Sequence, residues 1–188
     1  MKGDRLRAIL DFWFEGVDDS TVIRKKARPF CQWFVPRRSF DEAIRSRFES
    51  DVCLAAAGGL RDWTRTSRGT LGLILLLDQF PRNIYRHTPR MYAYDDQAQG
   101  LSRAMVISGR DRSLRLVERI FCYMPLTHAE DAALQALGLH CFEGLYREAE
   151  QNYPYNAAYY AWHRRYARKN HQVIRVEGRF RHRDPFRT

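Results

Sequence analysis

The segment from Thr70 to Tyr85 constrains the fold more than any other stretch of this chain. It is apolar almost all round, with six leucine or isoleucine side chains between Leu71 and Leu77, which is typical of a helix buried on every side. The apolar run is far shorter than the roughly 20 residues that a bilayer requires, so it predicts a core helix and no membrane span. Pro81 is expected to kink or stop this helix near its C-terminal end.

The remaining segments predict the helices that surround this core. Apolar residues recur at spacings of three and four, and no stretch alternates with period two for long enough to form a strand. We therefore expect an all-α fold of seven or eight antiparallel helices in a single domain, residues 1–188. The expected helix starts are Asp4, a capping box at Ser39–Glu42, Thr70, the N-caps Asp95 and Asp111, a capping box at Thr127–Glu130, and Pro154 or Asn156.

The second capping box carries most of the candidate chemistry. Pro125 is expected to impose an extended break between helices just before it, and Thr127 is expected to cap the helix that follows. That start would place His128, Asp131 and Gln135 along one edge of the same helix. A histidine beside an aspartate can act as a general base. A hydrogen-bonded structural histidine is the more common alternative, and we favour it here.

Asp78 to Asn83 is the first polar segment to follow the core helix. Asp78 and Arg82 stand four residues apart in the favourable order for a helical ion pair, and Gln79 and Asn83 have the same spacing. A buried carboxylate there needs a partner, because burying it alone costs several kcal/mol. The segment is either a lock at the helix end, with Asn83 capping backbone freed by Pro81, or a polar site at the rim of the core.

The charge of the chain is concentrated at its C-terminal end. The chain has 32 Lys or Arg residues and 22 Asp or Glu residues, and the segment 164–188 holds nine basic and two acidic residues. Such a segment could contact a polyanion such as RNA. It could also pair with acids on the body, which its short length favours. Arg179, His182 and Arg183 lie in an expected turn there and could grip a phosphate or carboxylate.

Several familiar chemistries are excluded by their missing motifs. The sequence has no phosphate-binding P-loop, no GxGxxG opening a helix, no HExxH and no GxSxG. We expect no cofactor, and the His, Glu and Asp spacing near His128 does not supply enough ligands for a metal. The four cysteines form no CxxC pair and lie among apolar residues, so we expect small buried side chains in a reducing, cytoplasmic protein.

Three segments together resemble a bacterial family of unknown function, the DUF924 proteins. They are LDQFPRNIYRHTPRMYAYDDQA at 77–98, ERIFCYMPLTHAEDAALQ at 118–135 and GRFRHRD at 178–184. The resemblance implies a fold similar to tetratricopeptide-repeat (TPR) proteins, a right-handed superhelix of antiparallel helix pairs, and attaches no activity. The tripeptide Leu-Gly-Leu at 71–73 recurs at 137–139, an offset of 66 residues that agrees with such repeats. The last motif departs from the family pattern at Val176, Glu177, Arg181 and Asp184.

Three functions remain open at this point. The first is a binding module whose polar site holds an anionic small molecule or peptide. The second is a small acid/base enzyme with His128, Asp78 and Asp131 as candidate catalytic residues. The third, which we do not favour, is RNA binding by the basic segment. The oligomeric state is left open. The candidate ligand-binding residues are Asp78, Gln79, Arg82, Asn83, Tyr123, His128, Glu130, Arg179, His182 and Arg183.

Overall fold

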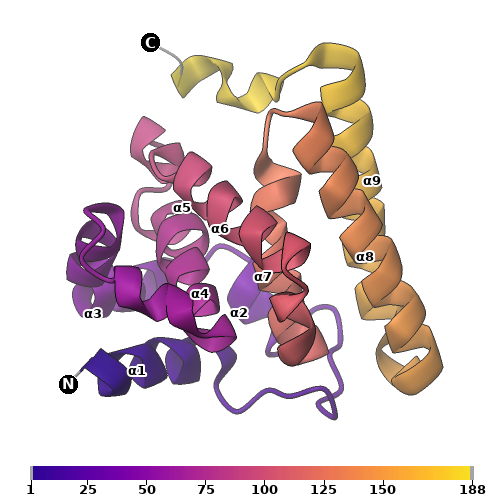
Figure 1. The fold of residues 1–188 in the computed structure, drawn as a ribbon, viewed down its shortest axis with the longest axis horizontal. Helices are drawn as coiled ribbons and strands as arrows, with labels where there is room; N and C mark the ends of the chain where they lie inside the picture. The colour runs from indigo at the N-terminus through magenta and orange to yellow at the C-terminus, as the bar shows by residue number, and fades with distance from the viewer. Residues whose placement is uncertain (1, 187–188) are drawn as a thin grey trace.

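A computed structural model describes residues 2–186 (Figure 1). Met1, Arg187 and Thr188, which end the predicted domain and its basic segment, lie outside the described residues. Within residues 2–186 the fold is all-α, as predicted, with no strand. The α-helices of this part are α1 (Lys2–Phe14), α2 (Phe30–Phe34), α3 (Arg38–Ala56), α4 (Ser67–Ile74), α5 (Phe80–Ile84), α6 (Asp95–Ile107), α7 (Leu116–His128), α8 (Ala132–Asn152) and α9 (Ala157–Glu177).

These nine helices exceed the seven or eight expected. The excess arises because the predicted core helix is divided and because the short α2 gave no periodic signal in the sequence. The TPR-like superhelix stays a prediction. Figure 1 shows α8 and α9 side by side as an antiparallel pair, with the chain after α9 turning back toward α5 and α6. That return places the last segment above the end of α7.

The predicted core helix is buried as expected, with Leu75 and Leu76 fully inaccessible to solvent. Pro81 does not stop it. Instead, α4 passes into one π-helical turn, Leu75–Gln79, and then into α5. Because Pro81 has no N–H to donate, a wider turn just before it accommodates the missing backbone bond. Short π-helical turns of this kind are often found at functional sites, and this one carries Asp78 and Gln79.

The capping box predicted at Thr127 is wrong. Helix α7 runs straight through Pro125 and ends at His128, and the Thr127 hydroxyl donates to the carbonyl of Met124, 2.8 Å away. The next helix is capped by Asp131, whose side chain accepts from the Leu134 N–H at 2.7 Å. His128 and Asp131 are therefore on different elements and share no helix edge. Burial of the whole α7 end outweighs the proline penalty of about 3 kcal/mol.

Other predicted helix starts also shift. Asp95 is the first residue of α6 and not its cap, and Asp111 lies in a separate 3₁₀ turn, Arg110–Ser113, before α7. Helix α3 begins at Arg38 with no side-chain cap, so the box predicted at Ser39–Glu42 is not formed. Asp95 and Asp111 instead make tertiary contacts, with Arg82 and with the Tyr123 hydroxyl. Among the cysteines, Cys122 and Cys141 are buried as expected, whereas Cys53 is exposed.

Candidate functional site

Five charged or ionisable side chains from five parts of the fold meet at one end of the domain. We call this group the polar cluster; its members are Asp78, Arg82, Asp95, His128 and Arg183. The π-helical turn, α5, the start of α6, the end of α7 and the segment after α9 each contribute to it. All five side chains are more than four-fifths buried, so their mutual pairing is required for stability.

Asp78 lies at the centre of the polar cluster and is fully buried. Its carboxylate is 3.1 Å from the Arg82 guanidinium and accepts from the Gln79 side-chain amide at 2.5 Å. Burial alone would raise the pKa of Asp78, but Arg82 and His128 outweigh it and bring the pKa down to about 2. Asp78 is therefore a carboxylate at neutral pH.

Arg82 and Arg183 converge on the second aspartate. Arg82 donates to Oδ2 of Asp95 at 2.9 Å and to the Asp78 carbonyl at 2.9 Å, and its guanidinium also lies 2.8 Å from Oδ1 of Asp95. Arg183 pairs with Asp95 at 3.1 Å and donates to the His128 carbonyl at 2.8 Å. Both guanidinium groups lie over the Tyr92 ring. Such planar groups, held from several sides, lose little freedom when a ligand binds.

His128 is oriented by Asp78. The Nδ1 atom of His128 is 2.8 Å from Oδ1 of Asp78. An ionised carboxylate can only accept, so Nδ1 carries the proton and donates it. In the neutral ring this leaves the lone pair on Nε2, which has no hydrogen-bond partner among residues 2–186. His128 lines a cavity, and Nε2 is the ring nitrogen left to face a ligand.

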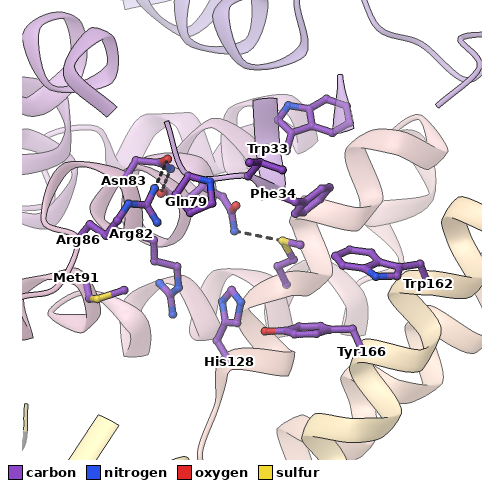
Figure 2. Close-up of a pocket in the computed structure, with 13 residues that line it drawn as sticks. Trp33, Phe34, Gln79, Arg82, Asn83, Arg86, Met91, His128, Trp162 and Tyr166 are labelled. Carbon is purple, nitrogen blue, oxygen red and sulfur yellow. Dashed lines mark hydrogen bonds between the residues drawn. The ribbon is translucent and has the colours of Figure 1, made fainter. Parts of the chain in front are cut away.

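The cavity consists of two adjacent hollows of about 340 and 590 Å³. They share four lining residues, Arg82, Met91, His128 and Tyr166. Figure 2 shows the first hollow, with the His128 ring near Tyr166. One wall of the first hollow is aromatic. It is formed by Trp33 and Phe34 of α2 and by Trp162 and Tyr166 of α9. The cavity thus has an apolar side and a side rich in N–H donors, as small-molecule sites do.

The charges on the cavity wall are mostly positive. Its basic, acidic and histidine lining residues are Arg82, Arg86, His128, Lys169, Glu177, Arg181, His182 and Arg183. The single carboxylate among them, Glu177, is paired with Arg181 at 2.6 Å. Asp78 and Asp95 lie behind the arginines and do not line the cavity. A negatively charged ligand in the cavity would therefore contact N–H donors, because the one carboxylate of the lining is already paired with an arginine.

Comparison with known proteins identifies the family. The model of a family described as bacterial proteins of unknown function, DUF924, matches residues 9–186. The chain belongs to the DUF924 family. A solved structure of a protein of unknown function from Agrobacterium tumefaciens, ATU0120, is similar to this DUF924 protein with 30% identity and a TM-score of 0.79. The similarity covers 99% of this chain and 91% of that one. No curated protein matches the sequence.

The predicted site residues of this DUF924 protein fall into three groups. Those that line the cavity are Gln79, Arg82, Asn83, His128, His182 and Arg183, with Asp78 directly behind them. Glu130 holds the returning segment in place, because its carboxylate accepts from the Phe180 N–H at 2.7 Å. Asn83 donates to the Gln79 carbonyl at 2.8 Å, the helix-end contact expected from its spacing.

Three of the predicted residues lie away from the cavity. Tyr123 is buried on another side of α7, where its hydroxyl bonds to Asp111 and accepts from Arg119. Asp131 is an exposed helix cap, and Arg179 is exposed and pairs with Asp184 at 3.1 Å. The hydrogen-bond and ion-pair partners of all three also lie outside the cavity lining.

Sequence reasoning missed Asp95 as the acid that joins the two arginines. It also assigned no site role to Trp33, Phe34, Trp162 and Tyr166, which form the aromatic wall. A polar residue at the start of α6 looks like an ordinary cap until α6 is placed beside α5. The aromatic residues are far apart in the sequence, and their helical spacing fits core packing equally well.

The basic C-terminal segment is mostly ordered structure. It forms the second half of α9 and a 3₁₀ turn, Arg181–Phe186. Arg168 pairs with Glu143, and Arg183 joins the polar cluster, so part of its charge is spent on acids of the body. Within residues 2–186, no group of three or more His, Cys, Asp or Glu side chains is arranged to hold a metal. In the same part of the chain, no helix is both long and apolar enough to cross a membrane.

Proposed function

We propose that this protein binds a small anionic ligand with an apolar body in the cavity between α2, α5, α7 and α9. The observation that carries the proposal is the position of the acids. Asp78 and Asp95 are buried behind Arg82 and Arg183, so the cavity wall presents N–H groups while the acids hold them in place. Preorganised donors of this kind cost little to order on binding.

The shape of the cavity suggests what such a ligand looks like. Its anionic group, a phosphate or carboxylate, would lie against Arg82, His128 and the exposed Lys169. Its apolar part would pack on the aromatic wall, between Trp162 and Phe34. The volume fits a small molecule or one or two side chains of an anionic peptide.

Phenyl phosphate is a suitable probe because it has both parts of such a ligand. We expect calorimetric titration to detect it, and to detect inorganic phosphate more weakly. His128→Gln should weaken binding by about tenfold and Lys169→Gln by about threefold. The matched controls are His140→Gln and Arg175→Gln, which change exposed residues outside the cavity and should leave the affinity unchanged. Equal weakening by a variant and its control would contradict the proposal.

The second candidate is an acid/base enzyme, which the Asp78–His128 hydrogen bond favours. Asp78 fixes the tautomer of His128, so Nε2 could take a proton from a substrate while the carboxylate stabilises the imidazolium. Assay with p-nitrophenyl phosphate distinguishes the two functions. Turnover that is lost in His128→Gln and kept in His140→Gln would favour the enzyme. Binding of phenyl phosphate without any turnover of the nitrophenyl ester would favour the binding module.

Two further parts of the proposal concern setting and partners. We infer a cytoplasmic location from the four free cysteines, and the partner as an anionic small molecule or peptide. Nucleic acid is a less favoured partner because several arginines of the basic segment already face acids. RNA binding by that segment would fall steeply with added salt. The TPR-like arrangement would offer a concave face to such partners.

A further inference from the structure

A second groove, separate from the cavity just described, lies between the α1–α2 connection and the start of α9. Its volume is about 540 Å³, within the range of small-molecule sites. It shares one residue, Trp162, with the first cavity. Its lining residues are Val22, Ile23, Arg24, Lys25, Phe30, Tyr155, Ala158, Tyr159, Trp162 and Arg165. We call it the aromatic groove.

The walls of the aromatic groove are tied together by buried hydrogen bonds. Asn156 is 1% exposed, and its side chain donates to the Thr21 carbonyl at 2.8 Å and accepts from the Ile23 N–H at 2.9 Å. The Tyr155 hydroxyl adds a bond to the Asp19 carbonyl at 3.2 Å. The connection that carries Arg24 and Lys25 is therefore held against α9, and the groove is a built feature of the fold.

One face of α9 and the turn before it lines the groove with aromatic rings. Tyr155, Tyr159 and Trp162 follow one another at spacings of four and three, which places them on a single face. Tyr155 is 50% exposed, so its ring is available to stack on a ligand. Tyr159 is buried, and its hydroxyl has no hydrogen-bond partner among the described residues.

The charges of the aromatic groove are all positive. Arg24, Lys25 and Arg165 line it, and its lining includes no acidic residue. None of these three has an ion-pair partner within residues 2–186, whereas Arg168, three positions after Arg165 on α9, pairs with Glu143 at 2.5 Å. Three unpaired cations beside aromatic rings complement a multiply charged anion that carries a ring.

We propose that the aromatic groove binds a nucleoside diphosphate or a closely similar nucleotide. The base stacks on Tyr155 and Trp162, and the phosphates lie among Arg24, Lys25 and Arg165. A single carboxylate would leave two of the cations unused. A single-stranded RNA needs a row of stacking platforms, and Tyr155 is the one aromatic side chain among the large exposed hydrophobic residues of the described chain. The groove therefore fits one base with its phosphates better than a strand.

The test is calorimetric titration of the full chain with ADP, adenosine, pyrophosphate and a ten-residue oligouridylate. We expect ADP to bind more tightly than adenosine and more tightly than pyrophosphate, because the groove engages both parts. Pyrophosphate that binds as well as ADP would overturn the proposal, because the rings would then contribute nothing. An oligouridylate that binds more tightly than ADP would overturn it in favour of an RNA surface, and absence of ADP binding at millimolar concentration would also end it.

Two variants locate the binding. Arg165→Gln should weaken ADP binding by about tenfold, and Tyr155→Ala should weaken ADP binding by a larger factor than it weakens pyrophosphate binding. The control is Arg175→Gln, an exposed arginine on the same helix outside both sites. Arg165 and Tyr155 do not line the first cavity. ADP binding that persists in Arg165→Gln but is lost in Lys169→Gln would assign the nucleotide to that cavity and overturn this proposal.

Discussion

Two histidines of this protein, His128 and His163, lie in opposite surroundings. His128 belongs to the polar cluster, where Nδ1 donates to Asp78 and the ring faces the cavity. His163 is fully buried on α9 among four aromatic rings, and neither of its nitrogens has a hydrogen-bond partner in the described chain. We call these rings the aromatic cage; they are Phe34, Phe142, Tyr159 and Trp162, with centroids 4.7 to 5.9 Å from that of His163.

The difference shows what a neighbouring charge does to a buried histidine. In the aromatic cage, burial lowers the pKa of His163 to about 3, so the ring is neutral under any physiological condition. In the polar cluster, Asp78 gives the ring of His128 a fixed orientation and an anionic neighbour. The first arrangement provides packing, and the second provides a hydrogen-bonding group directed at a ligand. The two regions meet through Phe34 and Trp162, which contact His163 and also line the cavity.

The largest expected effect comes from removing the central cation of the polar cluster. Arg82→Met should lower the free energy of unfolding by about 3–5 kcal/mol, because Asp78 and Asp95 each lose a buried partner. Urea denaturation measures it. The exposed Arg175→Met is the control and should change stability by less than about 0.5 kcal/mol. Arg5 is not suitable as that control, because its side chain bonds to Asp51. Equal denaturation midpoints for the two variants would show that Arg82 does not stabilise the polar cluster.

For a substitution in the aromatic cage we expect the opposite effect, a gain in the free energy of unfolding. His163→Phe should raise the free energy of unfolding by about 1–2 kcal/mol, because it removes two unsatisfied nitrogens from an apolar site of similar size. The same change at His128 should lower it, since the hydrogen bond to Asp78 is lost. Thermal and urea denaturation of the pair give the comparison directly. If both variants lose stability, the His163 ring has a partner that the cage does not contain.

As the pH is lowered from neutral, we expect His163 of the aromatic cage to reduce the stability before Asp78 of the polar cluster does. An unfolded histidine binds a proton below about pH 6.5, whereas folded His163 does so only near pH 3. Stability should therefore fall by about 1 kcal/mol between pH 6 and pH 5. His163→Phe should lose this slope. Asp78 adds its own loss only as the pH falls from about 4 toward 2, because its folded pKa is about 2. A slope that persists in the variant would assign it to another group.

The sequence predicted the part of the site that depends on local spacing. Asp78, Arg82 and Asn83 form the helix-end contacts that their four-residue spacing implies. The candidate residues named from the sequence also include His128 and Arg183, and both lie in the polar cluster. The parts that failed depended on tertiary packing. Pro125 was expected to end a helix, but its burial within α7 keeps the helix intact and moves the cap to Asp131.

The sequence could not distinguish the two histidines of the comparison. His163 lies among aromatic residues at helical spacing, and nothing local says whether a carboxylate packs nearby. Asp95 is similar, because its role depends on α6 lying beside α5 and on the return of the chain after α9. Contacts between residues 13 to 88 positions apart have no signature in a single sequence.

The most direct test of the account is the response of the two imidazole rings to a ligand. In ¹⁵N-labelled protein at neutral pH, addition of phenyl phosphate should move the Nε2 resonance of His128 and leave both ring nitrogens of His163 in place. Assignment uses His128→Gln and His163→Phe. The account predicts this selective shift because His128 alone of the two lines the cavity. A His163 ring that moves as much as His128, or a His128 ring that does not respond while phenyl phosphate binds, would contradict it.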